Sequence, residues 1–135
     1  MLPNENLLTT KLVVLSAPSG TGKSTLASML LRKRNNFDLS ISYTTRLPRG
    51  DERNAAHYFF VDDSEFEKMI QQNCFLEYAK VFEKYWYGTS RERVEKSLNS
   101  GKNVLFDIDV QGARSLKNAY GKRCITIFIL PPSIE

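Results

Sequence analysis

The chain has 135 residues, 41% hydrophobic and 25% charged, which suits one compact domain or a core with a small insertion. No apolar run is long enough to span a bilayer and the N-terminus lacks a signal-peptide layout, so we expect a cytoplasmic protein with no membrane partner. Two cysteines exclude a disulfide framework and favour buried free thiols, and one histidine excludes a multi-histidine metal site. The net charge of +4 suits an anionic partner, nucleotide or nucleic acid.

Hydrophobic periodicity predicts an alternation of strands and helices, with turn signals between them. Strands are expected at 11–16, 37–43, 57–61, 75–82, 85–88, 104–107 and 124–130, helices at 23–34, 62–72, 90–99 and 111–120, and a loop at 44–56. Ser64 and Glu67 fit a capping box in the second helix. Continuous apolar strands near both ends of the chain favour an α/β fold with a parallel sheet and helices on both faces. The aromatic, strand-rich middle predicts an inserted small mixed α+β module.

A glycine-containing loop between the first strand and the first helix is the most specific pattern. It matches G-x-x-x-x-G-K-[ST] except at the first position, where alanine replaces glycine. Such a loop wraps backbone N–H groups around a polyphosphate at a helix N-terminus; its lysine reaches the outer phosphates and its hydroxyl ligates Mg²⁺. The bland alternative is a glycine-rich turn with a stray lysine. The expected phosphate-binding residues are Ala17, Pro18, Ser19, Gly20, Thr21, Gly22, Lys23, Ser24 and Thr25.

Two arginines on either side of a proline form the second pattern. Arg46 and Arg49 flank Pro48, which fixes one backbone φ angle. Guanidinium groups bind phosphate through paired hydrogen bonds. Alone, the pair would more often be a solvated loop. Beside a phosphate-binding loop it predicts a second phosphate site, because a transferred phosphoryl group needs both a donor and an acceptor.

Carboxylates and aromatic residues supply further candidates. Glu77 lies in an alternating strand, where an outward-facing charge is the alternative. Asp107 and Asp109 end a buried strand, at the sheet edge where open parallel sheets bind ligands, although Asp109 also suits a helix N-cap. The aromatic run at 85–87 has a small hydrophobic cluster as its alternative.

Taken in order, these motifs resemble the guanylate kinase family. The family shows a GPSGxGKST loop, a TTRxPRxGE-like segment, a [DH]-Y-x-F strand, F-[IL]-E, a YYGT-type element and D-I-D-x-Q-G. The corresponding segments here are 17–25, 44–52, 57–60, 75–77, 85–89 and 107–112. The agreement in order and spacing covers nearly the whole chain from residue 11, and six linked motifs are more specific than any one.

The resemblance implies a P-loop core at 1–39 and 91–135 that binds ATP and Mg²⁺, and a GMP-binding module at 40–90. It implies phosphate contacts from Ser42, Arg46, Arg49, Tyr58 and Tyr87. Glu77 would accept hydrogen bonds from guanine N1–H and the 2-amino group, Thr89 would lie near O6, and Asp109 would be a second acceptor on the guanine side. Ser24 would ligate the metal, with Asp107 acting through water.

The chain departs from the family pattern in several places. Ala17 replaces the first glycine, one extra residue precedes Tyr87, and the segment 51–56 lacks the family's second glycine. The choice of Tyr87 over Tyr85 therefore rests on its place before Gly88. At 131–135 the family opens the helix that leads to a lid with arginines, so we expect the lid and the closing part of the core to be absent from this chain.

The expected reaction is ATP + GMP ⇌ ADP + GDP, a step of purine nucleotide metabolism, with dGMP as a further acceptor and no nucleic-acid partner. Its catalytic residues would be Lys23, Arg46 and Arg49, which position and neutralise phosphates; the attacking phosphate oxygen is already ionised, so no general base is needed. One alternative is a non-catalytic guanylate-kinase-like protein-binding module. Others are another P-loop small-molecule kinase, and a family member that is inactive as this 135-residue chain.

Overall fold

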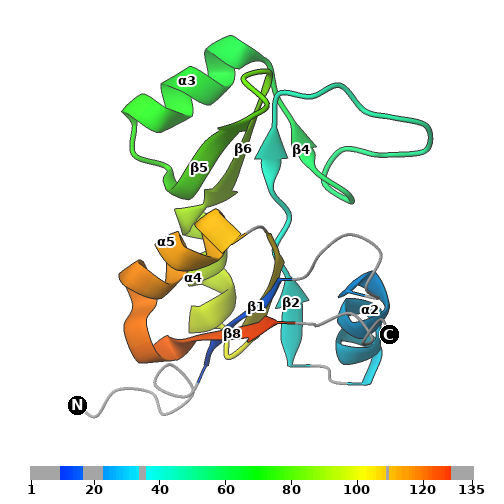
Figure 1. The fold of residues 1–135 in the computed structure, drawn as a ribbon, viewed down its shortest axis with the longest axis vertical. Coiled ribbons are helices and arrows are strands. Elements are labelled where there is room, and N and C mark those ends of the chain that lie inside the picture. Colours follow the sequence, from blue (N-terminus) through cyan, green and yellow to red (C-terminus); the bar gives the residue numbers. More distant parts are fainter. Residues whose placement is uncertain (1–9, 17–22, 34–35, 109, 129–135) are drawn as a thin grey trace, which may run out of the picture. The chain divides into compact units, whose positions relative to one another are not determined.

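The computed structural model describes residues 10–16, 23–33, 36–108 and 110–128, and of residues 23–25 the backbone alone. The chain divides into two compact units. The first unit consists of Met1–Ser40 and Lys96–Glu135, and the second of Ile41–Glu95. The second boundary falls inside helix α4 (Arg91–Asn99) rather than before it. Each unit has its own sheet (Figure 1).

The first unit contains a parallel sheet of four strands. Their order is β2 (Phe37–Leu39), β7 (Asn103–Asp107), β1 (Leu12–Ser16) and β8 (Cys124–Phe128). All three pairings are parallel, and every residue of the inner strand β1 is buried. A strand buried on both faces needs cover from both sides, which explains its continuous apolar sequence. The α/β fold with a parallel sheet expected from the sequence is therefore confirmed.

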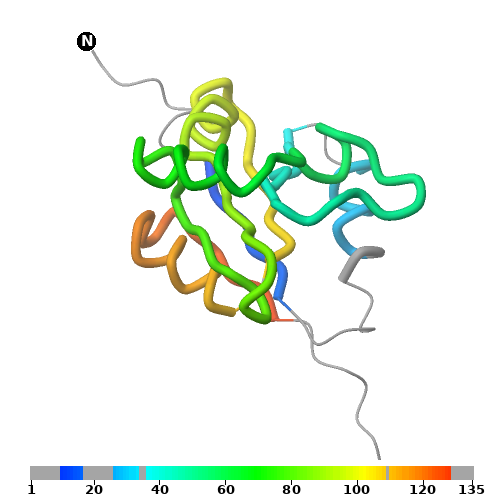
Figure 2. The backbone as a smooth tube through the Cα atoms, turned by 90° about the horizontal axis from the view of Figure 1, so that it is seen from above, coloured from blue at the N-terminus to red at the C-terminus, as the bar shows by residue number. Residues whose placement is uncertain are grey.

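Helices α2 (Lys23–Lys33) and α5 (Val110–Tyr120) lie on opposite sides of this sheet (Figures 1 and 2). On the α2 side, Ala27 packs in one cluster with Val13, Leu15 and Leu105. Side chains alternate across a strand, so the other residues of β1 turn toward the opposite face, where α5 buries Leu116. A short 3₁₀ helix, η1 (Gly121–Arg123), joins α5 to β8.

The second unit contains a mixed sheet. Its strands are β4 (Phe59–Phe60), β3 (Tyr43–Thr44), β6 (Tyr85–Ser90) and β5 (Phe75–Val81), in that order. β3 and β4 run parallel, whereas the two pairings of β6 are antiparallel. Helix α3 (Asp63–Gln71) covers one face, where the ring of Phe66 stacks on Phe75 at 4.6 Å and on Trp86 at 5.5 Å between centroids. Part of the aromatic run is thus a small core, the alternative reading above.

Two local expectations were wrong. The strand expected at 37–43 is two strands in different sheets. The Ser40 N–H makes the last hydrogen bond to the parallel sheet, at the Leu105 carbonyl, and the chain then leaves that sheet. Helix α3 is capped by Asp62, whose carboxylate accepts the Glu65 N–H at 2.7 Å, and not by Ser64. Aspartate caps as well as serine does, and Asp62 comes earlier in the chain.

The cysteines differ in their surroundings. Cys124 is buried and burial raises the pKa of its thiol, whereas Cys74 is only half-buried; both are free. In the part of the chain that the structure describes, no helix has the length and apolar character needed to cross a membrane.

Candidate nucleotide site

The expected ATP site is described only at its borders. Residues 17–22 and Asp109 lie outside the described residues, and no side chain is described for Lys23, Ser24 or Thr25. The borders have the geometry that the motif requires, since β1 ends at Ser16 and α2 begins at Lys23. The sequence of the loop therefore connects a buried parallel strand to a helix N-terminus.

Asp107 belongs to the first unit, at the end of a strand that pairs with β1. It ends β7 directly opposite Leu15 of β1 and is exposed. Among the described residues, no group of three or more His, Cys, Asp or Glu side chains gathers to hold a metal. An exposed carboxylate such as Asp107 is the kind of oxygen donor that Mg²⁺ prefers.

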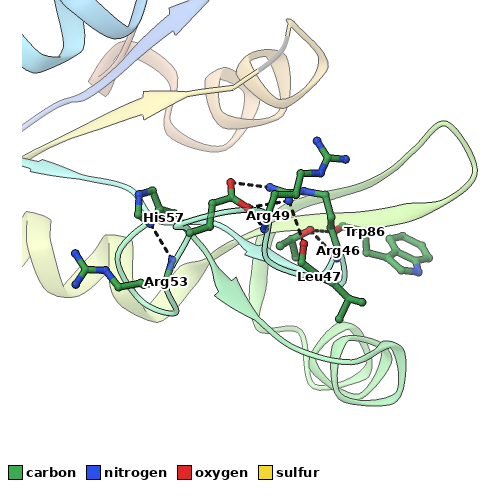
Figure 3. Close-up of polar contacts among 8 residues, drawn as sticks. Arg46, Leu47, Arg49, Arg53, His57 and Trp86 are labelled. Atoms are coloured by element: carbon green, nitrogen blue, oxygen red, sulfur yellow. Dashed lines mark hydrogen bonds and ion pairs between the residues drawn. The ribbon is translucent and has the colours of Figure 1, made fainter.

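Arg46 is the centre of the phosphate side of the candidate site in the second unit. It follows β3 and is buried, with 7% of its surface exposed. Its guanidinium donates to both carboxylate oxygens of Glu52, at 2.9 and 3.0 Å, and to the Leu47 carbonyl at 3.1 Å (Figure 3). It also lies over the Tyr58 ring, 5.2 Å from the centroid. The hydrogen bonds to Glu52 raise the pKa of Arg46 above its usual value, and Tyr87 adds to the shift.

The two expected tyrosines meet at this arginine. The rings of Tyr58 and Tyr87 lie edge to face with centroids 5.9 Å apart. Tyr87 reaches this position because it pairs with Thr44 across β6 and β3. Tyr85 instead contacts Lys84, so it is Tyr87 that lies beside Arg46.

The other two expected phosphate ligands flank the cluster. Ser42 is half-buried and its carbonyl accepts the Phe59 N–H at 2.9 Å, which joins it to β4. Arg49 is exposed on the turn that follows Arg46. A neighbouring turn is closed by the Arg53 N–H, which donates to His57 Nδ1 at 3.0 Å (Figure 3).

Glu77 and Thr89 form the base side of the candidate site. They are directly opposite on β5 and β6, and the Thr89 hydroxyl donates to Glu77 Oε1 at 2.6 Å. This length is typical of a hydroxyl bonded to a carboxylate. Thr89 is 1% exposed and Glu77 is half-buried. Glu77 is therefore not the freely solvated charge that strand alternation allowed.

A β-bulge turns Glu77 toward this side of the sheet. The pairing shifts between Phe75, opposite Ser90, and Glu77, opposite Thr89, so β5 contributes one extra residue here. Phe75 and Tyr78 consequently share the α3 face, as their contact with each other at 6.0 Å shows. Without the bulge, Glu77 would point to that same face.

The structure thus places Glu77, Tyr87 and Thr89 on one face of one sheet. Tyr87 and Thr89 are two residues apart on β6 and so share a face, opposite to the one that α3 covers. Tyr87 contacts Arg46 and Tyr58, and Thr89 is hydrogen-bonded to Glu77.

Glu52 is the residue of this site that was not singled out from the sequence. Its pKa falls to about 2, because it accepts two hydrogen bonds from Arg46 and one from the backbone N–H of Arg49. The available signal was its place as the last residue of the arginine motif. A separation of six residues between opposite charges in a loop does not by itself predict an ion pair.

A strand–loop–helix unit on a parallel sheet, with the loop sequence described above, defines a P-loop nucleotide-binding class of protein. The family model described as guanylate kinase matches residues 9–135. The chain belongs to the guanylate kinase family.

Similar proteins include guanylate kinases of several bacteria. That of Porphyromonas gingivalis is 52% identical over 127 residues, covering 93% of this chain and 68% of its own length. That of Rickettsia conorii is 55% identical over 124 residues, covering 92% and 53%. The crystal structure of guanylate kinase from Anaplasma phagocytophilum matches with a TM-score of 0.77 and 35% identity, over 92% of this chain and 61% of that one. The chain therefore spans between about half and two thirds of the length of these proteins.

Proposed function

We propose that this chain carries the nucleotide sites of an enzyme that transfers a phosphoryl group from ATP to GMP, giving ADP and GDP in purine nucleotide metabolism. The proposal rests on one observation: strand β6 brings together two groups of side chains, the guanidinium of Arg46 with Tyr58 and Tyr87, and the carboxylate of Glu77 with Thr89. A nucleoside monophosphate has the same two ends, a phosphate and a base.

The phosphate of GMP would bind at the cationic end. Arg46 and Arg49 supply guanidinium donors, and Tyr58 and Tyr87 supply hydroxyls beside Arg46. Ser42, the residue before β3, adds a further hydroxyl. These groups would hold and neutralise the acceptor phosphate, which needs positioning more than it needs a base.

The base would be selected at the other end. Guanine presents N1–H and the 2-amino group side by side, and a carboxylate such as Glu77 accepts from both. Adenine has no such pair of donors. A half-buried carboxylate left without its partners costs about 1–3 kcal/mol, so AMP should be disfavoured. By the resemblance, Thr89 would lie near O6 and Asp109 would be a second acceptor for guanine, and dGMP, which has the same base, would also be accepted.

ATP would bind at the loop 17–25. Lys23 would contact its outer phosphates, and Ser24 would hold Mg²⁺ with Asp107 acting through water. When bound, Mg²⁺ neutralises charge on the transferring phosphates. We further propose that the enzyme works in the cytoplasm, where both nucleotides occur and thiols stay reduced, in keeping with two free cysteines.

The test is a coupled assay of ADP release with ATP and each of GMP, AMP, CMP and UMP. It should be run on this chain and on a chain extended to the length of its relatives. We expect release that depends on GMP, and a loss of roughly a hundredfold or more in the extended Lys23→Met variant. Release with ATP alone, or equal rates with GMP and AMP, would contradict the proposal. Activity of the extended chain alone would show that the remaining segment is required.

A further inference from the structure

The contact between Glu52 and Arg46 has a geometry that leaves part of the guanidinium available. Glu52 takes one hydrogen from each terminal nitrogen, Nη1 and Nη2, and the Leu47 carbonyl takes the second hydrogen of Nη1. These bonds do not use Nε–H or the outer Nη2–H, which point along one side of the planar group. That pair of donors matches two oxygens of a phosphate, and the hydroxyl of Tyr87, which also hydrogen-bonds to this guanidinium, would share the phosphate with it.

We infer that Glu52 is a positioning residue for the phosphate of the nucleotide acceptor. Its carboxylate binds Nη1 and Nη2 of Arg46 and so orients the Nε–H and the outer Nη2–H toward the ligand. The inference rests on the proposed function, because it assumes that GMP binds at Arg46. Glu52 does not touch the substrate; it acts through Arg46.

The same carboxylate also fixes the turn that carries the second arginine. The Arg49 N–H donates to Glu52 Oε1 at 2.8 Å, and the Glu52 N–H donates back to the Arg49 carbonyl at 3.0 Å. This reciprocal pair closes the turn, in which Gly50 adopts a φ of +53°. One side chain therefore orients Arg46 directly and Arg49 through its backbone.

Glu52 could position Arg46 for the phosphate of GMP or compete with that phosphate for Arg46, and these two roles predict opposite effects of Glu52 on GMP binding. A carboxylate next to a phosphate repels it, so a Glu52 that merely competed for Arg46 would weaken GMP binding, and its removal would strengthen it. Arg46 is 7% exposed, however, and a long side chain that is fixed in advance loses less entropy when the phosphate arrives. We therefore expect removal of Glu52 to weaken binding.

The experiment measures GMP and guanosine affinities of this chain by NMR titration, for wild type and Glu52→Gln. We expect Glu52→Gln to weaken GMP binding about tenfold while guanosine, which has no phosphate, binds as before. Unchanged guanosine binding also shows that the variant is folded. Equal or tighter GMP binding by the variant, or a parallel loss for guanosine, would overturn the inference.

Two further variants separate the inference from its alternatives. Asp51→Asn is the matched control, since Asp51 is the adjacent exposed carboxylate and makes no hydrogen bond or ion pair within the described ranges; it should change GMP affinity less than twofold. In an Arg46→Lys background, Glu52→Gln should have almost no further effect, because the two residues act as one unit. Additive losses in that cycle would contradict the mechanism. If wild type itself fails to bind GMP, the proposed function fails instead.

Discussion

Glu77 is a half-buried carboxylate that already accepts one hydrogen bond from a buried hydroxyl. Because Thr89 donates its single proton to Glu77, it cannot at the same time donate to guanine O6. In this geometry the threonine orients the carboxylate, which under the proposed function would accept the hydrogen bonds of the base. Direct donation to O6, which the resemblance suggested for Thr89, would require the hydroxyl to rotate away from Glu77.

We predict that Glu77→Gln weakens GMP binding roughly 10- to 100-fold, because a glutamine amide presents donors where guanine also presents donors. AMP binding should change little, so the preference for GMP should collapse. Titration of both nucleotides checks this, with Glu67→Gln as a control at an exposed carboxylate on α3. A preserved preference in Glu77→Gln would show that another residue selects the base.

Glu52 makes the second unit sensitive to acid. Its pKa of about 2 in the folded protein lies below the ordinary value of 4.5, so its ionised form stabilises the fold at pH values above 4.5. This stabilisation is lost as the pH falls from 4.5 to 2, when the carboxylate becomes protonated and its bonds with Arg46 weaken.

We predict that Glu52→Gln lowers the free energy of unfolding at neutral pH, and that the difference from wild type narrows across this acid window. Urea unfolding at a series of pH values measures both curves. Asp51→Asn, which lacks the contact with Arg46, should keep the wild-type slope. A gap between wild type and Glu52→Gln that stays constant down to pH 2 would exclude this linkage.

At the scale of elements, strand β6 contributes functionally different side chains to the two faces of its sheet. Tyr87 and Thr89 face the candidate site, whereas Trp86 and Gly88 face the aromatic core under α3. The core tolerates no side chain at Gly88: a Cβ there would lie 2.8 Å from two ring carbons of Phe75 and 3.0 Å from Phe66. Both rings are buried and stacked, so neither moves at low cost.

We predict that Gly88→Ala destabilises the second unit by about 1–3 kcal/mol through overpacking. Thermal or urea unfolding monitored by Trp86 fluorescence measures the change. Combining it with Phe75→Leu, which makes room for the new methyl group, should cost less than the sum of the two single changes. Strict additivity would mean that the contact with Phe75 is not the cause.

The hairpin between β5 and β6 turns through two strained residues. Phe82 and Glu83 have φ values of 54° and 53°, and the Lys84 N–H closes the turn on the Val81 carbonyl at 3.0 Å. Positive φ at both central positions is the pattern of a type I′ turn, which favours Asn-Gly. Phe82 is 94% exposed, so its side chain contributes little packing in return.

We predict that the double change Phe82→Asn and Glu83→Gly stabilises the chain by about 1–2 kcal/mol, since each left-handed non-glycine residue costs roughly 1 kcal/mol and Asn and Gly tolerate this conformation better. Unfolding in urea measures the gain, and GMP affinity should not change. Phe82→Ala, which removes the ring but keeps the strained backbone, is the matched control and should give almost no gain. Equal stabilisation by Phe82→Ala would assign the effect to the exposed ring.

On the scale of the whole molecule, the parallel sheet was predictable because burial on both faces leaves an unmistakable apolar run, as in β1. The break between β2 and β3 was not, because residues 37–43 are uniformly suitable for a strand and only tertiary pairing divides them. The candidate residues Arg46, Tyr58 and Tyr87 were found through linked motifs, and the structure adds their mutual contacts.

Two features of the site depend on geometry that the sequence does not record. The bulge that turns Glu77 toward Thr89 is a shift in pairing register. The alternation of side chains along a strand does not reveal such a shift in the sequence. The partner of Arg46 is fixed by the path of the loop between them, and not by a regular spacing. The sequence therefore predicts which residues gather more readily than how each is oriented.

The two units also differ in which of their proposed activities can be measured with this chain. The proposed GMP contacts at Ser42, Arg46, Arg49, Tyr58, Glu77, Tyr87 and Thr89 all lie within Ile41–Glu95. The chain spans only part of the length of its relatives, so turnover is a property to examine in the extended chain. Apart from Asp109, which belongs to the first unit, the proposed GMP contacts lie in the second unit, so we expect this chain to bind the acceptor and its binding can be examined directly.

The most direct measurement is a titration of this chain, labelled with ¹⁵N, with GMP and in parallel with AMP. We predict that GMP shifts the amide signals of Arg46, Tyr87 and Thr89 in one saturable process, and that AMP binds at least tenfold more weakly. Equal affinities for the two nucleotides, or GMP-induced shifts that leave these three residues unmoved in a folded chain, would contradict the assignment of phosphate and base recognition to this sheet face.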